Sequence, residues 1–374
     1  MEGDFTYGFF TAINLLAGLQ GFILAGILLF KKRFASTSNR FYALALLGIS
    51  VIVLYDVLYY ALEADDPWSY VLYLPVYIRS SIPIGLYFFV RFLIEPKRAM
   101  NSWERFWWVP IALEFAIEIC FIVSEFLVSG EVLVRAEKLW RIAGETIGLL
   151  TALFLLGLAI VKLNRYQKFL LENYSSLTGK SLKWLRNLIA ASLIIVIVWV
   201  YGHLQFILGY EDELIYELVS LGLILFLFWM GYFVILQYPL FQVVPYSNKS
   251  LPKESSKKLS PKTEQYHGQL LQLMKEQQLF ADPELNLASL AEKLQISAGY
   301  LSQIINEKEE KNFFEFVNGY RVNAAKEKLT DNTYDQYSIL GIALESGFSS
   351  KSTFNSLFKK YTGQTPSAYK KAFQ

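Results

Sequence analysis

The chain has 374 residues, of which 54% are hydrophobic and 18% are charged, and its mean hydropathy is +0.32. Soluble proteins carry about 25% charged residues, so this composition excludes an ordinary soluble enzyme. The single cysteine, Cys120, and the two histidines, His203 and His267, exclude an intramolecular disulfide and argue against a metal centre built from cysteine or histidine. We therefore expect neither a metal ion nor another cofactor.

Long apolar stretches occupy residues 1–238. A helix needs about 20 apolar residues to cross a bilayer. Seven stretches meet this length, near residues 8–30, 41–62, 70–94, 106–129, 142–163, 185–209 and 214–237. The third is the weakest, because it contains Pro75, Pro83, Arg79 and Arg91. The pattern predicts a seven-helix transmembrane domain.

Lysine and arginine are unevenly distributed among the connections between these spans. If the N-terminus is outside, the inner connections hold 13 basic residues and the outer segments hold 3. Basic residues concentrate on the cytoplasmic side of membrane proteins. We therefore predict an inner-membrane protein with its N-terminus outside and its C-terminal region in the cytoplasm. The acidic start of the chain and the long first apolar run argue against a cleaved signal peptide.

Several ionisable side chains fall inside the predicted spans, where charge is costly and usually marks function. The candidates for a pocket that binds a signal ligand or senses protons are Asp56, Arg79, Glu118, Glu125, Glu145, His203 and Glu217. At a rise of about 1.5 Å per residue, most of them lie in the outer half of the bilayer. The alternative is that Glu125, Glu145 and Glu217, near span ends, only extend to the interface.

A polar segment separates the apolar part from a soluble one. Residues 247–264 are rich in lysine, serine and proline and lack an apolar period. Such a composition does not bury enough surface to fold. We therefore predict a flexible cytoplasmic linker over residues 239–264, followed by a soluble domain over residues 265–374.

The soluble part contains the same helical pattern twice. In the first copy, Asn286 and Ser297 are predicted N-caps of two short helices with apolar inner faces. In the second copy, Ser338 caps one helix, and Ser349 or Ser350 caps the next after a break at Gly347. Two short helices joined by a tight turn outline a helix-turn-helix. The prediction is an all-α protein with two such motifs behind a transmembrane bundle.

These residues also carry a family resemblance. The run GFSSKSTFNSLFKKYTGQTPSAYKK, residues 347–371, resembles the C-terminal signature of AraC-type transcriptional regulators. Residues 287–306 and 312–329 are similar to the first helix-turn-helix and the connecting helix of that family. The resemblance covers about residues 266–374. It implies DNA binding through two recognition helices placed about one DNA turn, roughly 34 Å, apart.

Carried over position by position, the resemblance implies which side chains face double-stranded DNA. The expected base-reading residues are Gly299, Tyr300, Ser302 and Gln303 on the first recognition helix and Lys351, Ser352, Asn355 and Ser356 on the second. Lys359, Lys360 and Lys308 are expected to contact phosphate. Many relatives have arginine at the positions of Gln303 and Ser356, so the base preference of this chain need not follow theirs.

The charge of the soluble part suggests modest affinity for DNA. Residues 263–374 hold 12 basic and 13 acidic side chains, whereas the last 28 residues hold five lysines and no acid. Nonspecific attraction to phosphate should therefore come mainly from the second motif. Modest affinity for one domain favours a homodimer.

Together, these patterns predict a membrane-bound, non-enzymatic, one-component transcription regulator, controlled by an unidentified signal ligand that is sensed in the lipid bilayer. The residues leave two alternatives open. One is a transporter or membrane receptor whose cytoplasmic helical domain mediates protein contacts, and the other is release of the soluble half by proteolysis.

Overall fold

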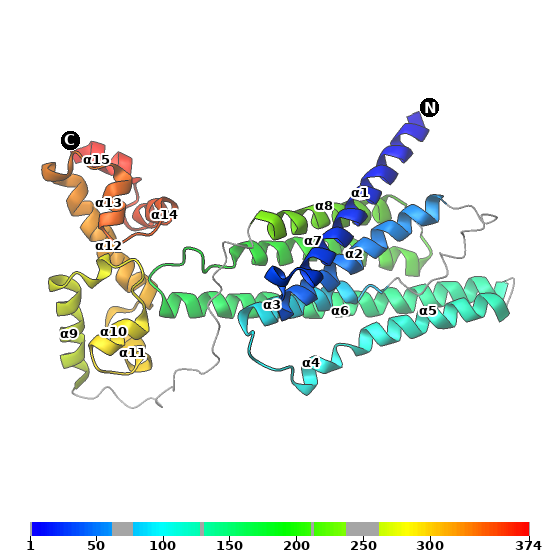
Figure 1. Cartoon of the computed structure of the whole chain (residues 1–374), viewed down its shortest axis with the longest axis horizontal. Helices are drawn as coiled ribbons and strands as arrows, with labels where there is room; N and C mark the ends of the chain where they lie inside the picture. The colour runs from blue at the N-terminus through cyan, green and yellow to red at the C-terminus, as the bar shows by residue number, and fades with distance from the viewer. Residues whose placement is uncertain (1, 62–77, 128–130, 211–212, 237–261, 374) are drawn as a thin grey trace. The chain divides into compact units, whose positions relative to one another are not determined.

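The computed structural model describes residues 2–61, 78–127, 131–210, 213–236 and 262–373. These residues contain no β-strand, so the predicted all-α fold is confirmed for them; an isolated bridge pairs Tyr174 with Asn286. The chain divides into two compact units (Figure 1). Unit 1 comprises Met1–Asn164 and Leu182–Phe241, and unit 2 comprises Arg165–Ser181 and Gln242–Gln374.

Unit 1 contains the apolar helices. Their bounds are α1 (Glu2–Phe30), α2 (Thr37–Ala61), α3 (Ser81–Ile94), α4 (Ser102–Phe106), α5 (Val109–Leu127), α6 (Glu131–Asn173), α7 (Lys183–Leu208) and α8 (Glu213–Leu236), with a 3-10 turn, η1, at Lys32–Phe34. Within the described residues, six segments are long and apolar enough to cross a membrane. They are Thr11–Phe30, Thr37–Leu58, Ser102–Ser124, Lys138–Asn173, Lys183–Leu208 and Leu214–Phe233. Six of the seven predicted spans thus correspond to such segments.

The third predicted span, residues 70–94, has no full-length counterpart. Residues 70–77 lie outside the described residues, and the remainder forms α3, which has 14 residues. At about 1.5 Å per residue a helix of this length is shorter than the roughly 30 Å hydrocarbon core. The described part of this segment therefore forms a short buried helix, in which Pro83 occupies the first turn, where its missing N–H costs nothing.

Arg91 explains how α3 ends. Its side chain is fully buried and makes a two-point ion pair with Glu104, with Nε and Nη2 lying 2.9 and 3.2 Å from the carboxylate oxygens. The guanidinium also donates to the backbone carbonyls of Glu95, Arg98 and Ala99. A buried guanidinium whose donors are paired in this way organises the connection between α3 and α4.

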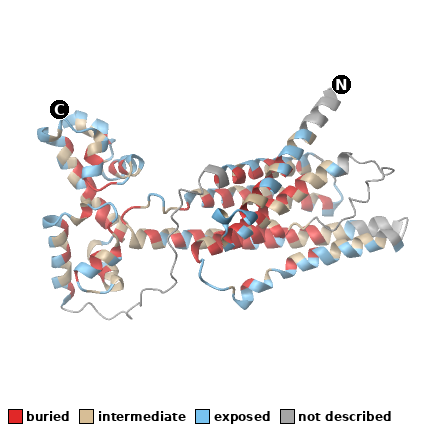
Figure 2. Ribbon diagram, in the orientation of Figure 1, coloured by how far each residue is buried: buried red, intermediate tan, exposed pale blue. Residues whose placement is uncertain are grey.

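Many large apolar side chains of unit 1 face outward. Leu16, Ile23, Ile194, Ile197 and Leu225 are each more than 60% exposed. Figure 2 shows exposed and half-buried residues along most of α5. Soluble proteins rarely expose apolar surface on this scale, whereas a lipid-facing surface requires it. The outward faces of unit 1 are thus of the kind that contacts lipid.

Helix α6 continues beyond the end predicted for its span. The sequence placed that end at residue 163, but the helix runs to Asn173, and its residues from Arg165 onward belong to unit 2. Tyr166 and Leu170, one turn apart, are both buried there. The buried face of α6 therefore continues past residue 163 at helical spacing, which accounts for the longer helix.

Unit 2 contains the soluble helices. Its elements after residue 261 are α9 (Lys262–Glu276), η4 (Leu279–Ala281), α10 (Leu287–Lys293), α11 (Ala298–Glu309), α12 (Phe313–Thr330), η5 (Asn332–Tyr334), α13 (Ile339–Glu345), α14 (Lys351–Thr362) and α15 (Pro366–Phe373). The predicted linker, residues 239–264, lies almost entirely outside the described residues.

Two separate hydrophobic cores build unit 2. The first joins α9, α10 and α11 to the start of α12, with Leu270, Leu290 and Phe316 among its buried residues. The second joins the end of α12 to α13 and α14, with Phe354 and Phe358 fully buried. Helix α12 therefore connects two half-domains, each with its own helix-turn-helix.

Candidate nucleic-acid interface

The second helix-turn-helix consists of α13, a turn and α14. The Oγ atom of Ser338 accepts the Gly341 N–H, which confirms the predicted cap of α13. Ser350, rather than Ser349, caps α14 by accepting the Thr353 N–H at 3.2 Å. Gly347 makes the turn with φ at +88°, and a Cβ there would lie 2.4 Å from the Phe280 carbonyl oxygen. Both the conformation and the space at this turn require glycine.

The outer face of α14 is open to solvent. The six α14 residues expected at the DNA are all exposed: Lys351, Ser352, Asn355, Ser356, Lys359 and Lys360. The Lys360 ammonium lies 3.4 Å from a carboxylate oxygen of Glu315 on α12. Among the described residues, no salt bridge involves Lys351 or Lys359. The outer face of α14 therefore presents the ammonium groups of Lys351 and Lys359 and the amide of Asn355 to solvent.

The first helix-turn-helix consists of α10, a turn and α11. Asn286 and Ser289 form a reciprocal capping box at the start of α10, and Ser297 caps α11, as predicted. The four expected base-reading residues, Gly299, Tyr300, Ser302 and Gln303, are only half exposed.

Helix α9 accounts for part of that burial. The Tyr300 hydroxyl lies 2.8 Å from the Thr263 hydroxyl, and Lys308 is paired with Glu264. Gln303 donates to Glu307 on its own helix at 2.8 Å. The side chains of α11 are therefore more engaged within the protein than those of α14. The expected base-reading residues of the first motif thus lie together on α11, and those of the second lie together on α14. The residues on α14 make fewer contacts with the rest of the protein.

Arg321, in the middle of α12, is a feature that the sequence does not single out. Its side chain is 1% exposed, and burial lowers the pKa of its guanidinium to about 10, so it stays protonated at neutral pH. Nε donates to the Phe280 carbonyl and Nη2 to the Asp282 carbonyl, both at 2.8 Å. The remaining donors reach Ser175, which follows α6. Arg321 thus fixes the loop before α10.

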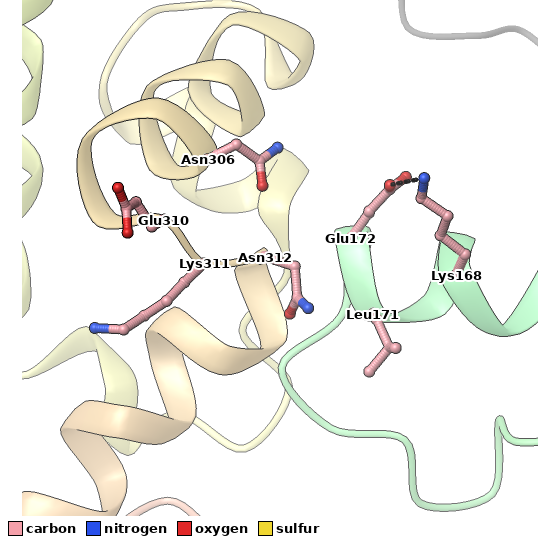
Figure 3. A pocket seen from close by; sticks show the side chains of 7 residues that line it. All are labelled: Lys168, Leu171, Glu172, Asn306, Glu310, Lys311 and Asn312. Atoms are coloured by element: carbon pink, nitrogen blue, oxygen red, sulfur yellow. Dashed lines mark ion pairs between the residues drawn. The ribbon is translucent and has the colours of Figure 1, made fainter.

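A hollow of about 490 Å³, lined mostly by polar and charged residues, lies in unit 2 between the end of α6 and the connection from α11 to α12 (Figure 3). Its lining residues are Lys168, Leu171, Glu172, Asn306, Glu310, Lys311 and Asn312. Lys168 and Glu172 pair with each other at 3.8 Å, as the dashed line in Figure 3 shows. The lining carries both signs of charge, and it includes none of the residues expected to bind DNA.

Comparison with known proteins bears on the same region. Residues 290–372 match the family described as "Helix-turn-helix domain". A melibiose operon regulatory protein from Escherichia coli (strain K12) is 33% identical over 93 residues, which are 25% of this chain and 30% of that protein. An uncharacterized HTH-type transcriptional regulator from Staphylococcus aureus (strain COL) is 38% identical over 87 residues, or 23% of this chain and 11% of the relative.

The C-terminal part of this chain is an AraC-type helix-turn-helix domain. The chain spans less than a third of the length of these curated relatives, so the likeness concerns this domain alone. A solved structure of a protein of unknown function from Listeria innocua is similar over 29% of this chain and 97% of its own, with 32% identity and a TM-score of 0.26.

Four of the predicted pocket residues fall into two polar clusters within the described residues of unit 1. In the first, Arg79 lies 3.9 Å from Glu118, and the neighbouring Ser80 donates its N–H and hydroxyl to Glu114. The Ser80 hydroxyl also approaches the Thr151 hydroxyl at 3.5 Å. Glu114 is not among the predicted pocket residues, although its buried carboxylate pairs with Ser80, next to Arg79.

The second cluster surrounds His203 on α7. Its Nδ1 lies 2.8 Å from Glu145, and its Nε2 lies 3.0 Å from the Thr146 hydroxyl. Arg141 lies 3.2 Å from the other oxygen of Glu145. Glu145 and His203 are both buried, so Glu145 does not simply extend into solvent.

The remaining pocket candidates are more dispersed. Asp56 on α2 is half-buried. Glu217 is exposed, outside both clusters. The side chain of Glu125 lies outside those that the structure describes.

Proposed function

We propose that this protein is a membrane-bound one-component transcription regulator. Its AraC-type domain binds specific double-stranded DNA through α11 and α14, and its apolar helices sense a signal. The observation that carries the proposal is the exposed polar face of α14 in a chain that also contains six helices of membrane-spanning length. A regulator of this kind needs no catalytic group or cofactor.

The proposed orientation in the membrane follows from the distribution of lysine and arginine among the connections. Seven spans with an outer N-terminus place the DNA-binding domain in the cytoplasm, where the DNA is. The third span would then include α3 and residues before it. A homodimer would double the contacts of a domain whose last 28 residues hold five lysines and no acidic residue. The six candidate spans and their outward apolar faces support the membrane part of the proposal.

The two polar clusters are the proposed place where the signal acts. Arg79 lies close to the second cluster as well, because a Cβ on Gly144, next to Glu145 in α6, would lie 3.4 Å from its Nη1 atom. A signal ligand or a proton that changed the pairing of Arg79 or His203 would shift the helices that carry them. We therefore retain Arg79, Glu118, Glu145 and His203 as signal residues.

The experiment that tests the function is capture of genomic DNA by the full-length protein in lipid nanodiscs at low and high salt. Enrichment of a shared sequence motif is the expected result. No enrichment at either salt concentration would contradict the proposal, and flux of a solute through vesicles containing the protein would then favour the transporter alternative.

Close packing around the first cluster gives a further prediction. A Cβ at Gly148 would lie 2.9 Å from the Arg79 Cβ and 3.1 Å from a Glu114 oxygen, whereas nothing lies within 4 Å at Gly157 on the same helix. Gly148→Ala is expected to destabilise the protein by about 1–3 kcal/mol because it overpacks the site. Gly157→Ala is expected to stabilise it by up to about 1 kcal/mol through helix propensity. Thermal unfolding in nanodiscs measures both, and equal effects would refute the tight contact.

A further inference from the structure

Residues 165–181 belong to the same compact unit as the DNA-binding domain, although about 80 residues, including α7 and α8, separate them in sequence. They comprise the last turns of α6 and a loop, residues 174–181, which we call the docking segment. In a seven-span topology this loop is a cytoplasmic connection between two spans. Its contacts with unit 2 are specific.

Ser175 is the buried anchor of the docking segment. It is 1% exposed, and its N–H and hydroxyl both donate to the Leu285 carbonyl, just before α10. Its own carbonyl accepts from Asn318 Nδ2 at 2.9 Å and from Arg321 Nη1 at 3.0 Å. Both donors are buried on α12. Because Ser175 is buried and its polar groups are hydrogen-bonded, withdrawing it from this site would leave buried polar groups without partners, which is costly.

The next residues of the docking segment reach the second helix-turn-helix. The Ser349 hydroxyl lies 2.7 Å from the Ser176 hydroxyl and 2.9 Å from the Thr178 hydroxyl. Ser349 directly precedes Ser350, the N-cap of α14. These contacts join neutral hydroxyls: Ser176 is buried, whereas Thr178 and Ser349 are exposed. Hydrogen bonds between neutral groups at such an edge contribute little net stability, because water can replace either partner. The contacts of Ser175 are thus fixed, whereas the contacts with Ser349 are easier to release.

The position of Ser349 makes that releasable contact important for DNA. Recognition helices enter the major groove with their N-terminal residues, and the N–H and hydroxyl groups at a helix start bind phosphate oxygens. The docking segment, whose Ser176 and Thr178 hydroxyls contact the Ser349 hydroxyl, therefore lies beside the N-terminus of α14. A DNA phosphate that binds at this N-terminus would therefore compete with Ser176 and Thr178 for the Ser349 hydroxyl and the turn around it.

We propose that the docking segment restrains DNA binding by α14, and that Ser176 and Thr178 must leave Ser349 for full affinity. This inference rests on the proposed function, since it assumes that α14 binds DNA. Residues 165–181, which include the docking segment, are joined covalently to unit 1 at both ends, through Asn164–Arg165 and Ser181–Leu182. A signal that moves α6 against α7 therefore acts on the docking segment directly.

A reversible cross-link tests the proposal in the full-length protein. Ser176→Cys/Ser349→Cys is made in a Cys120→Ala background with a protease site inserted after Ser250, and the protein is placed in nanodiscs. Oxidation is expected to form a disulfide, because the two hydroxyl oxygens it replaces are 2.7 Å apart. After protease cleavage, the two fragments should then migrate together without reductant. Ser176→Cys/Ser367→Cys, with the second cysteine exposed on α15, is the matched control and should not cross-link.

The readout is the Kd for a captured DNA site before and after reduction. The oxidised protein is expected to bind about tenfold more weakly than the same protein reduced, a typical size for coupling between sites. Failure to cross-link, or an unchanged Kd in the cross-linked protein, would overturn the inference. Absence of DNA binding by wild type at any salt would instead show that the proposed function fails.

A release variant tests the opposite direction without a cross-link. Ser176→Ala/Thr178→Ala removes both hydroxyls that hold Ser349 while leaving the buried Ser175 in place. It is expected to bind DNA about fivefold or more tightly than wild type. Equal or weaker binding by a variant with a wild-type melting temperature would count against restraint by the docking segment.

Discussion

Lys351→Ala/Asn355→Ala is expected to remove most of the sequence specificity with which the full-length protein binds DNA. Both side chains are exposed on α14, four residues apart and therefore on one helix face. A lysine contact to guanine or an asparagine contact to adenine contributes about 1–3 kcal/mol of discrimination. Loss of both should lower affinity for the captured site by about a hundredfold, and fluorescence anisotropy with specific and scrambled DNA measures the change.

The matched control for this pair is Asn323→Ala/Lys326→Ala, which removes the same two residue types from α12. It is expected to leave both affinities within about twofold of wild type, because surface changes away from the interface have small effects. If both double variants weaken specific binding equally, α14 does not read the DNA.

Lys359→Ala/Lys360→Ala should produce a different pattern on the same helix. These residues lie in the last turn of α14 and are expected to contact phosphate. Their loss should weaken specific and scrambled DNA alike, and it should reduce the slope of log K against log salt by about one per lost contact. A salt slope equal to that of wild type would exclude phosphate contacts by these lysines.

The caps and cores of the DNA-binding domain are predictable from sequence because local chemistry determines them. Asn286, Ser297 and Ser338 each precede an apolar helical period, and each accepts the N–H three residues later. The choice between Ser349 and Ser350 is not local. It depends on the turn at Gly347, which packs against the Phe280 carbonyl nearly 70 residues earlier.

The role of residues 165–181 could not be predicted in the same way. A periodic pattern shows that Tyr166 and Leu170 share a helix face, but it does not show what covers that face. The partners of Ser175 lie at residues 285, 318 and 321, more than 100 positions away. Contacts between polar groups at this separation leave no periodic signal in a single sequence. The same limit applies to the pairing of Glu145 with His203 in unit 1.

Arg321→Met is expected to destabilise the DNA-binding domain by about 3 kcal/mol or more. Methionine fills similar space but donates no hydrogen bond, so the buried Phe280 carbonyl and the partly buried Asp282 carbonyl lose a charged donor, and the Ser175 carbonyl keeps only Asn318. Each buried acceptor left without a partner costs about 1–3 kcal/mol. Burial lowers the pKa of Arg321 to about 10, so the charged donor is present throughout the physiological range.

Hydrogen exchange of the full-length protein measures this effect, because the most slowly exchanging amides of α10 and α12 report the opening free energy of the domain. Lys326→Met, on the same helix, is the control; Lys326 is half-buried, and no described side-chain bond involves it. It should change protection by less than about 0.5 kcal/mol. If the two variants lose equal protection, Arg321 contributes only general packing of α12. If Arg321→Met alone loses it, with faster exchange extending into residues 174–181, then the arginine holds the domain and the docking segment together as one cooperative unit.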